Sequence, residues 1–232
     1  MRQLSDALAV MGGRKRQRAG ALQDAAAFQR AQLKSNMTWN LTQLSELPGF
    51  TWHCPPPQWG WDRTGLFIEP AANTDFWQRT HYGFAADNGH FLFTKLATDF
   101  VASTTVRLQP RHQYDQAGLM VRLDAGCWIK TSVEFEPGAA NRLGVVVTHH
   151  GYSDWSTQDV PAELSEFGFR LARVGSEFLV SARYGTADWS QLRLVRLDCE
   201  PAATLAVGPY ACSPKGAGFR CEFNALSVEA PR

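Results

Sequence analysis

Trp128, Lys130 and Glu134 together supply the groups that hold a sugar-like ligand. The C–H faces of a sugar pack on an aromatic ring, while its hydroxyls exchange hydrogen bonds with an ammonium group and a carboxylate. The alternative is an ion pair between Lys130 and Glu134 beside an exposed tryptophan, worth about 0 to 1 kcal/mol. Because side chains two positions apart point to the same side of a strand, we favour a shared ligand face.

The surrounding segment, residues 114–155, indicates how that face is built. If residue 122 lies opposite residue 128, Leu119, Val121 and Ile129 share an apolar face and Asp124 to Gly126 form the turn of a hairpin. A second hairpin then turns at residues 137–141. The opposite face carries a set of residues suited to a polar ligand: Gln116, Arg122, Trp128, Lys130, Glu134 and His150.

Neighbouring segments supply further candidates for ligand binding. Trp77, Arg79 and His81 alternate along an expected strand at 76–82 and so share one side, although Trp77 could equally be a core residue. Residues 153–156 follow a glycine and predict a loop at the mouth of the groove, with Asp154 and Trp155 as rim contacts. The alternative for that loop is an Asx-type turn with Trp155 as its apolar plug.

Asp115 begins the central strand, where it either caps the groove or braces the preceding turn. Glu134 is the candidate catalytic residue, because glycoside hydrolysis uses a pair of carboxyl groups. Asp115 or Asp154 could be its partner. Glu136 also points to the same side, about 7 Å further along the strand, but Pro137 follows it, which favours a solvated turn residue.

Composition narrows the class of protein. The chain has 232 residues, 44% of them hydrophobic, enough for one full core, and its net charge of +1 gives no reason to expect nucleic acid. No apolar run is long enough to cross a membrane, so we expect a cytoplasmic protein that does not bind membranes.

The five cysteines show no CxxC spacing, which argues against a zinc site and a disulfide framework. A single disulfide between Cys212 and Cys221 stays open. His149 and His150 point in opposite directions along a strand, and no third ligand can be placed beside either. We therefore expect neither a metal nor a cofactor.

The chain divides into an N-terminal appendage at 1–36, helical or disordered, and a β domain at 37–232. In the β domain, short apolar or alternating runs are separated by Gly, Pro, Asn and Asp at intervals of about ten residues, which is typical of a sandwich. The expected strands are 65–68, 76–82, 90–94, 100–108, 116–123, 128–135, 143–149, 167–174, 178–184, 192–197, 203–209 and 218–228. So many strands suit two packed sheets.

Motifs in this region resemble those of a known family, recurring in order from about residue 38 to residue 228. They are Thr74-Asp75-Phe76-Trp77, Asp87-Asn88-Gly89-His90, Tyr114-Asp115-Gln116-Ala117-Gly118-Leu119-Met120, Trp128-Ile129-Lys130, Val146-Val147-Thr148, Ser153-Asp154-Trp155-Ser156 and Gly208-Pro209-Tyr210 with Ser213-Pro214. The chain resembles the regulation-of-enolase family, long labelled a domain of unknown function, within the concanavalin A-like lectin/glucanase superfamily. The resemblance implies an all-β jelly-roll sandwich of two curved antiparallel sheets, the concave one often used for ligands.

The same resemblance has a limit. Glucanases of the superfamily usually carry their catalytic carboxylates in an ExDxxE pattern, and the nearest match here, Glu134-Phe135-Glu136, lacks the third member.

We therefore expect a carbohydrate-type binding domain with a small molecule or glycan as ligand. The alternatives are a glycan-active hydrolase or lyase using Glu134, and a regulatory module linked to central metabolism that contacts a protein through the same face or through Trp59 and Trp61.

Overall fold

The computed structural model describes residues 37–43 and 46–229, and they form an antiparallel β-sandwich. The first sheet has the order β15-β14-β13-β8-β17-β4-β3, with β1 paired to β17. Its strands are β1 (Met37–Asn40), β3 (Gln58–Asp62), β4 (Gly65–Glu69), β8 (Phe100–Gln109), β13 (Glu166–Val174), β14 (Glu177–Tyr184), β15 (Ser190–Arg196) and β17 (Arg220–Glu229). The appendage predicted for residues 1–36 lies outside the described residues.

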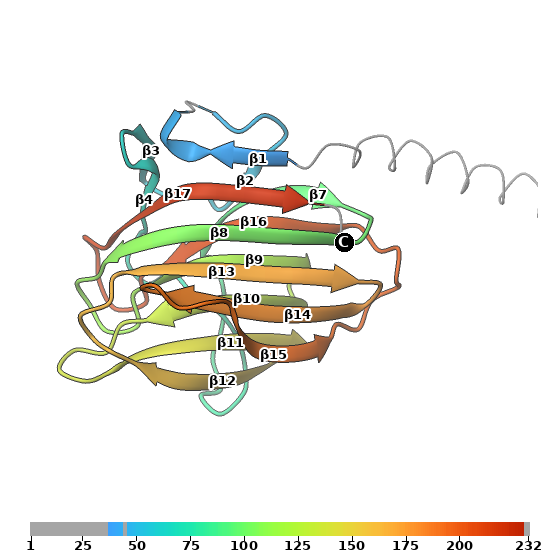
Figure 1. The fold of residues 1–232 in the computed structure, drawn as a ribbon. Coiled ribbons are helices and arrows are strands. Elements are labelled where there is room, and N and C mark those ends of the chain that lie inside the picture. Colours follow the sequence, from blue (N-terminus) through green and yellow to red (C-terminus); the bar gives the residue numbers. More distant parts are fainter. Residues whose placement is uncertain (1–36, 44–45, 230–232) are drawn as a thin grey trace, which may run out of the picture. The chain divides into compact units, whose positions relative to one another are not determined.

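The second sheet has the order β12-β11-β10-β9-β16-β7-β2 and lies behind the first in Figure 1. Its strands are β2 (Thr51–His53), β7 (His90–Leu96), β9 (Gln116–Asp124), β10 (Cys127–Glu134), β11 (Asn141–His149), β12 (Tyr152–Val160) and β16 (Leu205–Cys212). A separate pair consists of β5 (Phe76–Gln78) and β6 (Ala85–Asp87). We call this pair, with its connecting loop, the β5–β6 hairpin.

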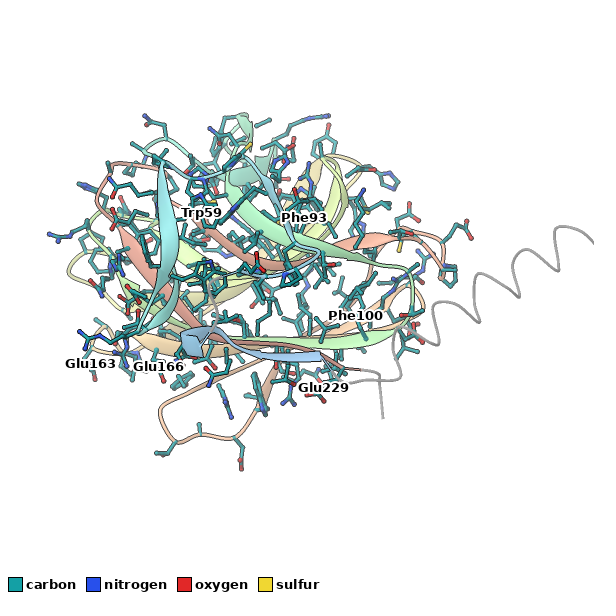
Figure 2. All side chains as sticks on the ribbon, turned by 90° about the horizontal axis from the view of Figure 1, so that it is seen from above. Trp59, Phe93, Phe100, Glu163, Glu166 and Glu229 are labelled. Atoms are coloured by element: carbon teal, nitrogen blue, oxygen red, sulfur yellow. The ribbon has the colours of Figure 1, made fainter. Side chains whose placement is uncertain are left out.

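The main core fills the space between the two sheets, as the view from above shows for residues such as Phe100 (Figure 2). Leu119, Val121, Ile129 and Val147 all face it from the second sheet. The predicted register is confirmed, because Trp128 pairs with Arg122 across β9 and β10. The turn at residues 125–126 is tighter than expected, and a bulge at residues 127–128 absorbs the difference.

The expected strands are present with shifted ends, and the all-β sandwich is confirmed. The strand expected at 76–82 ends at Gln78, because Arg79 and His81 adopt positive φ angles of 54° and 64° that leave the extended region. Residues 153–156, expected to form a loop, belong instead to β12. β12 is the edge of the second sheet and is mostly exposed, so it lacks the apolar alternation that reveals a half-buried strand.

A second, smaller core lies on the face of the second sheet that is turned away from the first sheet, which we call the outer face. It consists of Phe76, Trp77, Phe91, Met120, Trp128, Val146, Tyr210 and Cys212. Phe76 and Trp77 come from the β5–β6 hairpin, and the others come from the second sheet. The hairpin therefore covers part of the outer face and buries the apolar side chains that the second sheet alone would leave exposed there.

The alternative disulfide is not formed, because Cys212 lies in this second core while Cys221 lies in the main core, and both are free. In the part of the chain that is described, no helix is long and apolar enough to span a membrane.

Arg122 and Asp87 fasten the β5–β6 hairpin to the sheet. The guanidinium donates from Nη1 to Oδ1 at 2.6 Å and from Nη2 to Oδ2 at 2.8 Å, and it also lies 5.9 Å from the centroid of the Phe76 ring. The Arg122 side chain is only 12% exposed. Such two-pronged, poorly hydrated pairs are the strong ion pairs of proteins.

We expect Asp87→Asn to cost about 2 to 4 kcal/mol of unfolding free energy, because it leaves the poorly solvated Arg122 unpaired. Arg122→Met should cost less, about 1 to 3 kcal/mol, because the Asp87 side chain is 30% exposed and keeps part of its hydration. In a double-mutant cycle measured by urea unfolding, the coupling should reach about 1 to 3 kcal/mol. The exposed pair Arg107 and Glu166 is the control, with an expected coupling of about 0 to 1 kcal/mol. Equal coupling in the two pairs would show that the hairpin is not held by this contact.

Candidate functional site

A pocket of about 410 Å³ opens on the outer face beside the β5–β6 hairpin. Its polar floor consists of Asp75, Gln116, Lys130 and Glu134. Its walls are aromatic: Trp77, Tyr82, Phe84, Tyr114 and Trp155. Asn73, Ala86, Pro214 and Lys215 complete the lining. A volume of this size is ordinary for a small-molecule site.

Strand alternation brings the floor together. Glu134 pairs with Gln116 across β9 and β10, and Lys130 pairs with Val146, which in turn pairs with Trp155. Paired residues on neighbouring strands point to the same side of a sheet. Asp75 is added from the residue that precedes β5, and the loop that follows β5 adds Tyr82 and Phe84.

The Lys130 ammonium is the centre of the floor. Its Nζ donates to Gln116 Oε1 at 2.8 Å and to Asp75 Oδ1 at 3.2 Å, and the Tyr210 hydroxyl donates to the same Gln116 oxygen at 3.1 Å. Burial disfavours the charged form, but the Asp75 and Glu134 carboxylates outweigh it, so the pKa of Lys130 is raised. The lysine is therefore a charged donor within the pocket.

Glu134 is the exceptional group of the floor. It is 8% exposed, and burial raises the pKa of its carboxyl group to about 7; Lys130 opposes this change, while Asp75 and Glu136 add to it. Across residues 37–43 and 46–229, no side chain forms a hydrogen bond or ion pair with this carboxylate. Glu136, the candidate dyad partner, instead accepts a hydrogen bond from Gln113 at 2.8 Å and does not line the pocket.

Of the predicted site residues, the structure brings Trp77, Gln116, Lys130, Glu134 and Trp155 together in the pocket. Trp77 belongs to the second core, which was one of the two roles that the sequence left open, and it also lines the pocket. Whether these residues bind a ligand stays a prediction.

Trp128 was predicted to be an exposed aromatic plate, and that prediction is wrong. Its side chain is fully buried in the second core, 6.2 Å from the Phe76 ring, with its indole N–H donating to the Ala125 carbonyl. The β5–β6 hairpin covers it, and a separate set of aromatic rings lines the pocket instead.

Asp115 and Arg122 are also structural. Asp115 is fully buried and accepts hydrogen bonds from the backbone N–H groups of Arg111 and His112 and from the hydroxyl of Ser213. It therefore braces the turn before β9, which was one of its two predicted roles. Arg122 is occupied by Asp87 and does not line the pocket.

The remaining candidates lie outside the pocket lining. His150 sits in the turn before β12 and pairs with Asp198 at 3.1 Å, and Asp154 points away from Trp155 to pair with Arg193 at 3.3 Å. Arg79 lies over the Tyr152 ring at 5.2 Å from its centroid, and His81 lies edge-on to Tyr82. The loop expected to carry Asp154 is a strand, so its neighbouring side chains diverge.

Sequence reasoning missed Asp75, Tyr82, Phe84 and Lys215 as pocket residues, and it gave Tyr114 no place among the ligand-binding residues. Asp75 stood in the Thr74-Asp75-Phe76-Trp77 motif, which was the available signal. Tyr82 and Phe84 had none, because only the folding back of the hairpin places them over the sheet. No cluster of at least three His, Cys, Asp or Glu side chains suited to a metal ion occurs among the residues described.

Known proteins share this architecture. A family described as "Protein of unknown function (DUF1349)" matches residues 52–231. The chain belongs to this family. A relative named "Regulation of enolase protein 1", from Saccharomyces cerevisiae, is 35% identical over 188 residues, covering 81% of this chain and 92% of the relative, which confirms the resemblance drawn from the motifs.

Among solved structures, this DUF1349 domain is similar to a functionally unknown protein from Saccharomyces cerevisiae, with a TM-score of 0.73 and 32% identity over 81% of this chain and 100% of that one. It is also similar to Bacteroides ovatus xyloglucan PUL GH43B, with a TM-score of 0.67 and 14% identity over 85% of this chain and 40% of that one. The second likeness shows the shared sandwich fold alone.

The raised pKa of Glu134 in this DUF1349 domain makes stability depend on pH. Because the folded pKa of about 7 lies above the ordinary 4.5, protonation stabilises the fold fully below the ordinary value, and this stabilisation is lost as the pH rises through about 7. Between pH 5 and pH 8, the unfolding free energy of the native protein should therefore fall by about 2 to 3 kcal/mol relative to that of Glu134→Gln, which has no carboxyl group to titrate.

Urea unfolding of both proteins at the two pH values measures this difference. His90 and His149, whose pKa values are lowered by burial, contribute with the opposite sign, but they are present in both proteins and cancel. Parallel pH profiles would show that the Glu134 carboxyl titrates normally.

Proposed function

We propose that the pocket binds a small carbohydrate-type ligand. The observation that carries the proposal is the combination of aromatic walls with a buried, charged floor in one pocket of about 410 Å³. Aromatic faces accept the apolar C–H side of a sugar ring, and the floor offers donors and an acceptor for its hydroxyls. The indoles of Trp77 and Trp155 take the role first expected of Trp128.

Unused hydrogen-bonding capacity in the floor supports this proposal. Lys130 has three N–H groups, of which Asp75 and Gln116 occupy two. The Gln116 amide donates one N–H to the Tyr114 carbonyl at 3.3 Å, which leaves its second N–H. With the Glu134 carboxylate, the floor can offer two donors and one acceptor to a polyhydroxylated ligand.

A second candidate function is glycan hydrolysis, and the Glu134 pKa of about 7 favours it, because general acids and bases work best near the ambient pH. Asp75 would be the second carboxylate, since it lines the pocket, whereas Asp115 and Asp154 do not. The name of the yeast relative favours a third candidate, a regulatory module whose ligand or protein partner affects a metabolic enzyme.

Ligand binding is tested with a panel of mono- and disaccharides, both neutral and amine-bearing, in thermal-shift and calorimetric measurements. A ligand that binds only the folded protein raises the melting temperature. We expect Tyr82→Ala to weaken binding about five- to tenfold, because it removes one aromatic wall. Tyr152→Ala is the matched control, because both tyrosines are 57% exposed and only Tyr82 lines the pocket.

Equal losses in the two tyrosine variants would place the ligand elsewhere, and an absence of binding across the panel would contradict the proposal. The hydrolysis candidate is tested on whichever glycan binds. Turnover that falls by about a hundredfold or more in Glu134→Gln, with binding kept, would indicate catalysis. Binding without turnover in the native protein would exclude it for that glycan.

A further inference from the structure

The Glu134 carboxylate lacks a partner in a pocket where every other charged floor group has one. Lys130 pairs with Asp75 at 3.2 Å, so these two charges compensate each other. Buried carboxylates are normally paired or hydrogen-bonded, because taking a charge out of water is costly. Glu134 is more than nine-tenths buried, and its open side faces the pocket.

The aromatic walls add a second attraction for positive charge. The face of an aromatic ring is electrically negative and attracts an ammonium group within about 6 Å. One cation already uses this property at the rim, where Lys215 Nζ lies 5.6 Å from the centroid of the Tyr114 ring. Trp77, Tyr82 and Trp155 are further aromatic residues in the lining of the same pocket.

We infer that the ligand of this pocket carries a protonated amine, with Glu134 as its counter-ion and the aromatic walls around it. This inference rests on the proposed function and narrows it: the ligand class is an amino sugar rather than a neutral one. The sugar ring stacks on an indole, its hydroxyls meet the free donors of Lys130 and Gln116, and its ammonium group donates to Glu134. A neutral or acylated sugar supplies only an uncharged donor to the carboxylate and leaves its charge uncompensated.

The groups that surround Glu134 determine whether its carboxyl group is protonated. They are Lys130 on the same strand, Asp75 before the hairpin, Glu136 after β10, Tyr114 before β9, and Tyr210 and Cys212 on β16. Of these, Asp75 and Glu136 disfavour the Glu134 anion and Lys130 favours it, while the two tyrosines and the cysteine have raised pKa values and stay neutral. A bound ammonium group adds a second favourable charge, so Glu134 gives up its proton to the solvent when an amino sugar binds.

The inference is tested by calorimetry of the full chain with matched sugars: glucose, glucosamine and N-acetylglucosamine, and the corresponding galactose and mannose series. In at least one series at pH 7 we expect the amine to bind about tenfold more tightly than both companions, a difference of about 1.4 kcal/mol. In buffers of different ionisation enthalpy, the apparent binding enthalpy should change with the buffer, which reports the released proton.

Two variants locate the effect. Glu134→Gln should abolish the preference for the amine and the proton release, and it should remain folded because it removes only a buried charge. Glu136→Gln is the matched control: it removes an acid two positions away that Gln113 already holds, and it should keep both. Melting curves confirm that each variant is folded.

The outcomes are distinct. Preference for the amine that depends on Glu134 supports the inference. If a neutral sugar binds as tightly as its amine, or if the preference survives Glu134→Gln, the inference is overturned while the carbohydrate site stands. If no sugar in any series binds, both the inference and the proposed function fall.

Discussion

The hydrogen bonds of the buried Lys130 ammonium to Gln116 and Asp75 are the interaction on which the geometry of the candidate site depends. Lys130 is 2% exposed and joins three parts of the chain: β10, which carries it, β9 through Gln116, and the segment before β5 through Asp75. A buried charge with imperfect partners is costly, so the hydrogen bonds that satisfy it also fix where these segments lie. The same contact therefore sets the position of the β5–β6 hairpin and the shape of the pocket floor.

The hairpin gives the outer face of the second sheet two different surfaces. Where Phe76 and Trp77 pack against Trp128 and Tyr210, the outer face becomes a dry second core. Beside it, the aromatic side chains of Trp77, Tyr82 and Phe84 stand around polar groups that the hairpin does not cover. Both strands of the hairpin are fixed at its open end, since Phe76 pairs with Asp87: Arg122 binds Asp87 at the end of β6, and Lys130 binds Asp75 just before β5. The hairpin thereby adds aromatic walls to this part of the sheet, which becomes the floor of an open pocket.

The alternation of apolar and polar side chains along the strands explains which parts of the fold could be predicted from the sequence. The period of two, with Val121 and Ile129 on one side and Lys130 and Glu134 on the other, defined both the sandwich and the two faces of β9 and β10. Which outer-face residues remain open depends instead on the docking of a segment distant in sequence. Trp128 and Arg122 have the same alternation as Lys130, but the hairpin buries one and binds the other. Nothing in a local pattern separates them.

The edge strand β12 was the second feature that the sequence did not predict. β12 pairs with β11 alone, so most of its side chains face water and show no apolar period. Because residues 153–156 belong to a strand, the consecutive side chains of Asp154 and Trp155 point to opposite sides of the sheet, and only the tryptophan lines the pocket. The wrong prediction of a loop at residues 153–156 therefore also explains the wrong prediction that Asp154 lies at the rim of the pocket.

The unpaired state of Glu134 carries a functional argument that its burial alone would not. Structural acids in this protein are satisfied, as Asp115 is by backbone and hydroxyl donors and Asp87 by a guanidinium. Glu134 has neither kind of partner, and the same burial moves its pKa to about 7. A fold gains no stability from such a group, since glutamine would fill the same space without the cost of the charge. Perturbed acids of this kind concentrate at functional sites, where a missing partner is supplied by a ligand or substrate. The unpaired carboxylate is therefore the strongest reason to interpret this pocket as the proposed binding site and not as an extension of the core.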